Sequence, residues 1–186
     1  MKQASSQSKK GERVALDFCA KTELVEARRW TERLIWRLLN AVGKPSPLVL
    51  VANCTDGRDT EIFLQRGARI VSICASEKQL EFARRQVPSG DFCLLNLECL
   101  DLPAEEFDAV WCVGLQMTNS NSHQILSELA RVLKSGGILA FDWGRETTKT
   151  VGDVSDFLSG FVLVERESYP EDLFAGGIEH IMMRKW

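Results

Sequence analysis

The chain has 186 residues, a formal net charge of −3, and 45% hydrophobic and 26% charged residues. These values are ordinary for one globular domain that is long enough to bury a substantial core. The weak negative charge argues against a general nucleic-acid-binding protein, and no apolar run reaches the roughly 18–20 residues that a membrane helix needs.

The N-terminal segment and the cysteines bear on the domain organisation and the cellular compartment of the protein. Residues 1–11 are polar and basic and lack the apolar segment of a secretory signal. We therefore expect residues 1–20 to form a disordered polar tail, residues 21–186 to form a single domain, and the protein to be cytoplasmic. The six cysteines contain no Cys-x-x-Cys pair, so we expect small buried thiols and no metal site.

The first predicted element is an amphipathic helix over residues 22–42, where apolar residues recur at helical spacing before Gly43 and Pro45. Trp30 and Trp36 lie in this helix among four arginines. Two interpretations are open: the helix packs on a sheet with a solvated basic face, or its arginines receive an acidic partner.

Apolar runs and helical patterns then alternate to the end of the chain. The predicted strands cover residues 48–53, 69–74, 91–96, 107–113, 138–143, 161–168 and 178–185. The predicted helices cover residues 58–66, 76–86, 122–134 and a short segment near 153–159. Ser76 and Gln79 form a capping box at the start of the second of these.

This alternation predicts an α/β protein with a doubly wound, seven-stranded, mostly parallel sheet that is built from right-handed crossovers. The last two strands have no long helix between them. We therefore expect them to form an antiparallel C-terminal hairpin at one edge of the sheet.

The loop after the first strand is the most informative segment for function. A buried strand that feeds a helix through a short turn is where open α/β sheets bind nucleotides. Such loops usually carry several glycines, but here only Gly57 remains, with Asn53 and Thr55 where glycines are expected. Asn53 tolerates a positive φ better than Thr55 does. Either the polar side chains stabilise the turn by themselves, or they bind a different ligand.

Several segments match one family in the right order: residues 75–84, 101–103, 107–111 and 128–139. Each segment is weak alone, but the ordered set is specific. Over about residues 25–186, the chain resembles the class I S-adenosylmethionine (SAM)-dependent methyltransferases. The resemblance implies a Rossmann-like methyltransferase fold, SAM as cofactor and transfer of a methyl group. It also offers a further interpretation of the first helix, as a lid over the cofactor or substrate pocket.

The resemblance implies a set of cofactor-binding positions: Asn53, Thr55, Gly57, Cys74, Ala75, Glu98, Cys99 and Cys112. The first three correspond to the loop around the methionine end of SAM. Glu98, with Cys99 beside it, retains the acidic residue that normally meets the adenine amino group. Cys112 is expected to offer backbone atoms to the amino group of the cofactor.

Two positions depart from the family pattern. An acidic residue normally starts the first loop, where this chain has Val51, and another normally binds the ribose hydroxyls, where it has Cys74. Hydrogen bonds to a charged group contribute roughly 1.5–3 kcal/mol each, so the loss weakens binding by about 10- to 1000-fold or abolishes it. Glu77 either reaches the ribose instead or is an exposed carboxylate that favours the start of its helix.

Methyl transfer depends mainly on proximity and alignment, and it needs a general base only when the acceptor must lose a proton. The candidate catalytic residue is His123, near the carboxyl edge of the sheet, and the alternative is a surface histidine at a helix start. His180, in the last strand, is expected to lie far from that edge.

The substrate pocket is expected in the loops that follow the fourth and fifth strands. By the resemblance, Gln116, Thr118 and Asn119 line it. Trp143 either forms a wall of this pocket or packs in the core.

Three functions remain open on the sequence. The first is a SAM-dependent methyltransferase that acts on a small-molecule acceptor. The second is a catalytically inactive methyltransferase-like protein that serves as a binding or scaffolding subunit for a protein partner. The third is a repurposed methyltransferase fold with non-methylating chemistry, such as a cyclisation. Neither a nucleic acid nor a membrane is expected as a partner.

Overall fold

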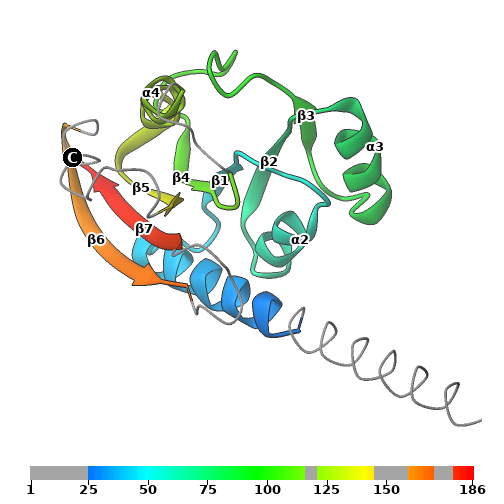
Figure 1. The fold of residues 1–186 in the computed structure, drawn as a ribbon, viewed down its shortest axis with the longest axis horizontal. Coiled ribbons are helices and arrows are strands. Elements are labelled where there is room, and N and C mark those ends of the chain that lie inside the picture. The colour runs from blue at the N-terminus through cyan, green and yellow to red at the C-terminus, as the bar shows by residue number, and fades with distance from the viewer. Residues whose placement is uncertain (1–24, 116–120, 145–158, 170–177) are drawn as a thin grey trace, which may run out of the picture. The chain divides into compact units, whose positions relative to one another are not determined.

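The computed structural model describes residues 25–115, 121–144, 159–169 and 178–186 (Figure 1). The chain divides into two units, Met1–Leu34 and Ile35–Trp186. The predicted tail and nearly all of the short helix predicted near 153–159 lie outside the described residues. No helix in the described ranges is long and apolar enough to cross a membrane.

A helix occupies residues 25–42, in agreement with the amphipathic pattern, and Gly43 ends it with a φ of 68°. Within the first unit, the guanidinium carbon of Arg33 lies 3.9 Å from the centroid of the Trp30 ring. This is the geometry of a cation–π contact. It gives one of the four arginines of this helix a local partner.

The second unit is built on one sheet of seven described strands in the order β3-β2-β1-β4-β5-β7-β6. The first five strands pair in parallel, and β7 is antiparallel to both β5 and β6. The bounds are β1 (Leu48–Val51), β2 (Arg69–Cys74), β3 (Phe92–Leu94), β4 (Phe107–Cys112), β5 (Leu133–Gly144), β6 (Phe161–Ser168) and β7 (Ile178–Lys185). The doubly wound sheet with an antiparallel C-terminal hairpin is therefore confirmed.

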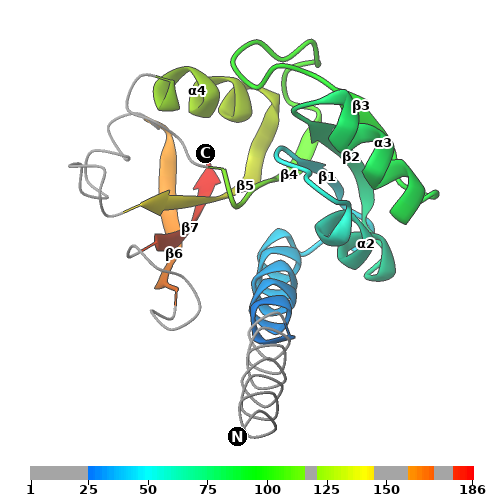
Figure 2. The ribbon, with the colours of Figure 1, turned by 45° about the vertical axis from the view of Figure 1, so that its right-hand side comes forward.

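Helices cover both faces of this sheet (Figure 2). They are α2 (Arg58–Gln65), α3 (Glu77–Gln86) and α4 (Ser122–Val132). On one face, Leu126 and Leu129 of α4 belong to the same buried cluster as Val110 of β4. On the other face, Phe63 of α2 packs edge-on against Trp111 of β4, with ring centroids 5.7 Å apart. Because both faces are covered, the central strands are continuous apolar runs rather than alternating ones.

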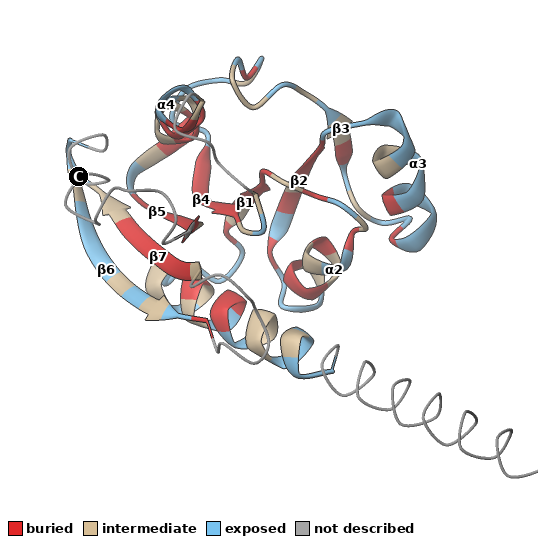
Figure 3. Cartoon of the chain, viewed as in Figure 1, coloured by how far each residue is buried: buried red, intermediate tan, exposed pale blue. Residues whose placement is uncertain are grey.

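Burial follows the position of each strand in the sheet (Figure 3). Every residue of β4, in the middle, is buried, whereas β6 at the edge is mostly exposed. The chain reverses its winding direction between β1 and β4. In open α/β sheets, ligands bind in the crevice outside the carboxyl ends of the strands at such a switch point.

One strand begins earlier than the sequence predicted. The predicted fifth strand starts at residue 138, whereas β5 starts at Leu133, directly after α4. Leu133 pairs with Phe107, and the regular pairing resumes at Ile138 after a register shift. Gly136 absorbs this irregularity with a φ of 79°, so Gly136 and Gly137 form a bulge inside the strand.

Candidate functional site

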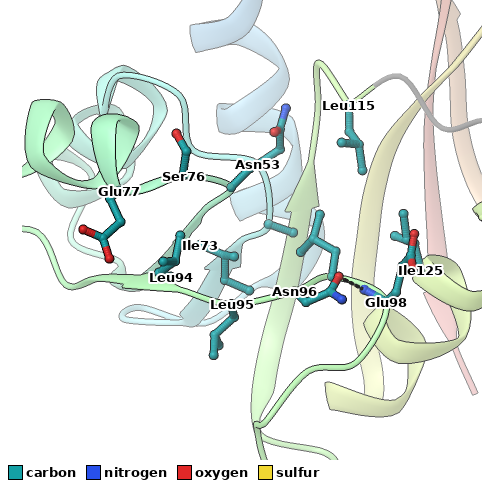
Figure 4. Close-up of a pocket in the computed structure, with 13 residues that line it drawn as sticks. Asn53, Ile73, Ser76, Glu77, Leu94, Leu95, Asn96, Glu98, Leu115 and Ile125 are labelled. Carbon is teal, nitrogen blue, oxygen red and sulfur yellow. Dashed lines mark hydrogen bonds between the residues drawn. The ribbon is translucent and has the colours of Figure 1, made fainter.

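A pocket of about 570 Å³ opens at the carboxyl ends of β1, β2 and β3 (Figure 4). Its lining residues come from the segments that follow these strands, from Leu115 after β4 and from Ile125 of α4. They are Ala52, Asn53, Ile73, Ala75, Ser76, Glu77, Leu94, Leu95, Asn96, Leu97, Glu98, Leu115 and Ile125. Ligand pockets in proteins are typically apolar clefts of roughly this size that carry a few polar groups.

The loop after β1 sends its polar side chains to two different places. Asn53 lines the pocket, and its Nδ2 donates a hydrogen bond of 3.4 Å to the carbonyl of Val113 after β4. Thr55 instead lines a separate groove on α3, together with Phe82 and Arg85. Neither Asn53 nor Thr55 has a positive φ. In the described ranges, Glu105 is the only non-glycine residue with a positive φ.

Gly57 is the loop residue whose position requires glycine. It precedes α2 with a φ of 86°, in the left-handed region. A Cβ atom there would lie 3.1 Å from Cγ2 of Val87, at the end of α3. The single remaining glycine therefore permits both the turn and the close approach of α2 to α3.

The end of β2 does not present Cys74 to the pocket. The Cys74 side chain is wholly buried and does not line the pocket, whereas the next residue, Ala75, does. Burial raises the pKa of the Cys74 thiol to about 12, and the neighbouring Cys54 thiol contributes further. The position that normally carries the ribose carboxylate is occupied here by an inert buried thiol.

Two carboxylates line the pocket from different segments. Glu77 begins α3, and Glu98 follows β3. The backbone of Glu98 is held on both sides: its N–H donates to Oδ1 of Asn96 at 3.0 Å, and its carbonyl accepts from Nε2 of Gln124 at 2.9 Å. Neither carboxylate forms a hydrogen bond or ion pair with another residue in the described part of the chain.

The remaining predicted cofactor positions lie outside the pocket wall. Cys99 is exposed beside Glu98, and Cys112 is wholly buried in the core at the end of β4. The sequence missed the apolar wall formed by Ile73, Leu94 and Leu97. In the sequence, their residue types do not differ from those of core positions.

Of the predicted substrate positions, Trp143 is the only one within the described residues. It is 3% exposed and packs edge-on against Phe141 in the core, with ring centroids 6.4 Å apart. Gln116, Thr118 and Asn119 lie outside the described residues. His123 is exposed in the first turn of α4 and does not line the pocket, although Ile125 of the same helix does.

A second polar cluster, missed by the sequence, lies at the carboxyl end of β5. Asp142 accepts hydrogen bonds from the Gly114 N–H at 2.8 Å and from the Tyr169 hydroxyl at 2.9 Å, and its Oδ1 lies 3.2 Å from Nδ1 of His180. The expectation that His180 lies far from this edge was wrong. Strand β7 runs antiparallel to β5, so His180 pairs with Asp142, two residues before the end of β5.

The surroundings of this cluster are acidic. Burial raises the pKa of Asp59 in α2, although a hydrogen bond of 2.9 Å from Nε1 of Trp111 opposes the shift. Burial and the negative charges of Asp142 and Asp59 raise the pKa of Tyr169. Asp142 contacts Gly114, Tyr169 and His180, and it thereby ties the loop after β4 to the C-terminal hairpin.

Comparisons with known proteins agree with the fold. A family model described as "Methyltransferase domain" matches residues 50–141. A malonyl-[acyl-carrier protein] O-methyltransferase of Salmonella typhimurium is 26% identical over 145 residues, which cover 77% of this chain and 55% of that protein. An uncharacterised methyltransferase of Synechocystis is 37% identical over 105 residues, which cover 55% of this chain and 50% of that protein.

Among solved structures, magnesium protoporphyrin IX methyltransferase from Synechocystis with bound SAM has a TM-score of 0.76 and 17% identity. The match covers 91% of this chain and 84% of that one. The sheet order and the pocket at its switch point define a Rossmann-like nucleotide-binding class of protein. Within that class, this chain belongs to the class I SAM-dependent methyltransferases, and it spans about half the length of the curated relatives that it matches.

Proposed function

We propose that this chain binds SAM in the pocket at the ends of β1–β3 and transfers its methyl group to a small-molecule acceptor. One observation carries the proposal: the pocket combines apolar walls with two carboxylates that have no partner in the described part of the chain. An adenosyl group offers a flat apolar ring, an amino group and two ribose hydroxyls. Carboxylate oxygens accept hydrogen bonds from such donors, so the residues present fit the cofactor.

The roles of the pocket residues follow from their positions. Ile73, Leu94 and Ile125 supply apolar surface for the adenine ring, and Glu98 supplies the acceptor for its amino group. Asn53 lies on the side of β1 and β4, where the family places the methionine end. The bound cofactor supplies a methyl group on a reactive sulfonium. The protein therefore has mainly to orient the reactants and exclude water.

The acceptor is expected at the carboxyl ends of β4 and β5, beside the methionine end of the pocket. Asp142 holds the backbone of Gly114, the second residue after β4, and thereby positions the loop that leads from this strand. The named relatives act on a malonyl group on a carrier protein and on a magnesium porphyrin. A small-molecule acceptor is consistent with the second of these and remains our proposal for this chain.

A second function, a methyltransferase-like subunit without methyl transfer, is favoured by one specific observation. The two positions where the family has acidic residues hold Val51 and Cys74, and both side chains are buried in the core. If no other group replaces them, the pocket lacks two of its polar contacts to the cofactor.

Calorimetric titration with SAM and with S-adenosylhomocysteine separates the two functions. We expect binding by the wild type, with loss of binding in Ala75→Leu, because the larger side chain projects into the pocket. The matched control is Ala104→Leu, which adds the same atoms at an exposed position before β4, outside the pocket wall. Absence of wild-type binding up to millimolar ligand would favour the subunit function instead.

A further inference from the structure

The start of α3 places in the pocket a carboxylate that has no protein partner in the described ranges. Ser76 is the N-cap of α3, and its hydroxyl accepts from the Gln79 N–H at 3.3 Å and donates to Oε1 of Gln79 at 3.3 Å. The Ser76 hydroxyl is thus occupied by the cap. Glu77 follows it, lines the pocket and has no hydrogen bond or ion pair to any residue in the described ranges.

Glu77 extends into the pocket from the segment that follows β2. Strand β2 pairs with β1 on one side and with β3 on the other. Figure 4 shows Glu77 extending from α3 on the side of Leu94, with Glu98 across the pocket. Of the two carboxylates, Glu77 is the one that belongs to the β2 side.

Among the described residues at the end of β2, the Ser76 hydroxyl is engaged in the helix cap, and the two residues before it offer no side-chain acceptor to the pocket. Cys74 is wholly buried against Cys54, and Ala75 has no polar side-chain atom. The helix N-terminus at α3 also favours a negative charge at its first residue, Glu77.

We infer that Glu77 binds the ribose hydroxyls of the adenosyl group, so that in this chain the carboxylate has moved from the end of β2 into the first turn of α3. The inference rests on the proposed function, because it requires an adenosyl ligand in this pocket. It explains how a pocket without an acid at position 74 retains a specific contact to the sugar.

The test is a calorimetric cycle with two ligands and two proteins. The ligands are S-adenosylhomocysteine and its 2′,3′-dideoxy analogue, and the proteins are the wild type and Glu77→Gln. We expect Glu77→Gln to weaken binding of S-adenosylhomocysteine about tenfold, the lower end for a charged hydrogen bond, because Glu77 is exposed. The dideoxy analogue should bind both proteins equally, because it has no hydroxyl for the carboxylate to hold.

Glu81→Gln is the matched control, since Glu81 lies one turn further along α3, pairs with Arg85 at 3.0 Å and does not line this pocket. It should bind both ligands as the wild type does. Glu77→Gln binding S-adenosylhomocysteine as tightly as the wild type, or losing equal affinity for both ligands, would overturn the inference and leave the proposed function standing. A wild type that binds neither ligand would overturn both.

Discussion

Oδ1 of Asp142 lies 3.2 Å from Nδ1 of His180, across the antiparallel pairing of β5 with β7. The His180 side chain is fully buried, and its Nε2 atom has no hydrogen-bond partner among the described atoms. The tautomer that fits this geometry carries its proton on Nδ1 and donates it to Asp142. The same carboxylate also accepts from Gly114 and Tyr169, so one side chain satisfies donors from three other segments.

Asp142→Asn should therefore destabilise the fold. The amide retains one acceptor oxygen and turns an NH₂ group toward at least one of the three donors, which therefore loses its hydrogen bond. We expect the free energy of unfolding to fall by about 2 kcal/mol. Urea denaturation measures it, and Asp101→Asn, at an exposed site, is the control. Equal stability of the two variants would show that Asp142 does not organise this edge.

Asp108 at the opposite edge predicts a pH dependence. Burial alone would raise its pKa, but hydrogen bonds from Lys44, from the Leu48 N–H and from Lys134 lower it from 3.8 to about 2. A lowered folded-state pKa stabilises the fold above pH 3.8, and this contribution is lost as the pH falls toward 2.

Asp108→Asn should accordingly cost about 2 kcal/mol at pH 7, and the cost should shrink as the pH falls from about 4 to 2. Denaturation curves of both proteins across this range measure the difference. If the stability difference between the two proteins does not change with pH, Asp108→Asn acts by disturbing packing and not by removing the carboxylate charge.

Restoring the acid of the family at position 74 should harm this chain rather than help it. Cys74 is wholly buried beside Cys54, so Cys74→Asp takes a carboxylate out of water, and the positive charge of Arg84 offsets only part of this cost. We expect a loss of about 2 kcal/mol at pH 8, a smaller loss at pH 5 where the new carboxyl is more often protonated, and no gain in affinity for S-adenosylhomocysteine. Cys99→Asp, at an exposed site, is the control. Tighter binding by Cys74→Asp would instead show that position 74 faces the ligand.

Gly57→Ala separates two costs of adding a methyl group. Gly57 and Gly136 both have a positive φ, but a Cβ at Gly57 meets Val87 at 3.1 Å, whereas at Gly136 nothing lies within 4 Å. Gly136→Ala should cost about 1 kcal/mol for the backbone alone. Gly57→Ala should cost about 1 kcal/mol more, because the Val87 side chain must shift by a few tenths of an ångström to make room for the new methyl group. Thermal or urea unfolding of both variants checks the difference, and equal losses would exclude the steric contribution.

The fold was largely accessible from the sequence, because its signals are local. The apolar run and caps around β2 gave its bounds as 69–74, and β6 and β7 also have the predicted ranges. Strand β1 is shorter than predicted, since Ala52 already bonds to the Trp111 carbonyl beyond the regular strand. The order β5-β7-β6 is set by packing between distant segments, and for that reason the place of His180 could not be read from the chain.

The candidate site could be predicted only at positions that the family pattern identifies. Asn53, Ala75 and Glu98 were predicted as cofactor positions, and they line the pocket. Leu94, Leu97 and Ile125 line it too, but an apolar residue in a pocket wall has the same sequence signature as one in the core. Asp142 was missed because its three donors come together only in the folded chain.

The shared use of Asp142 also limits how the acceptor end can be altered. The loop after β4, the end of β6 and the start of β7 each send one group to this carboxylate, which itself lies near the end of β5. Replacing one of these segments with that of a relative would remove a hydrogen-bond donor from the Asp142 carboxylate or place a new side chain against it. Redesign of this end toward a new acceptor will therefore succeed only when the loops are exchanged as a set.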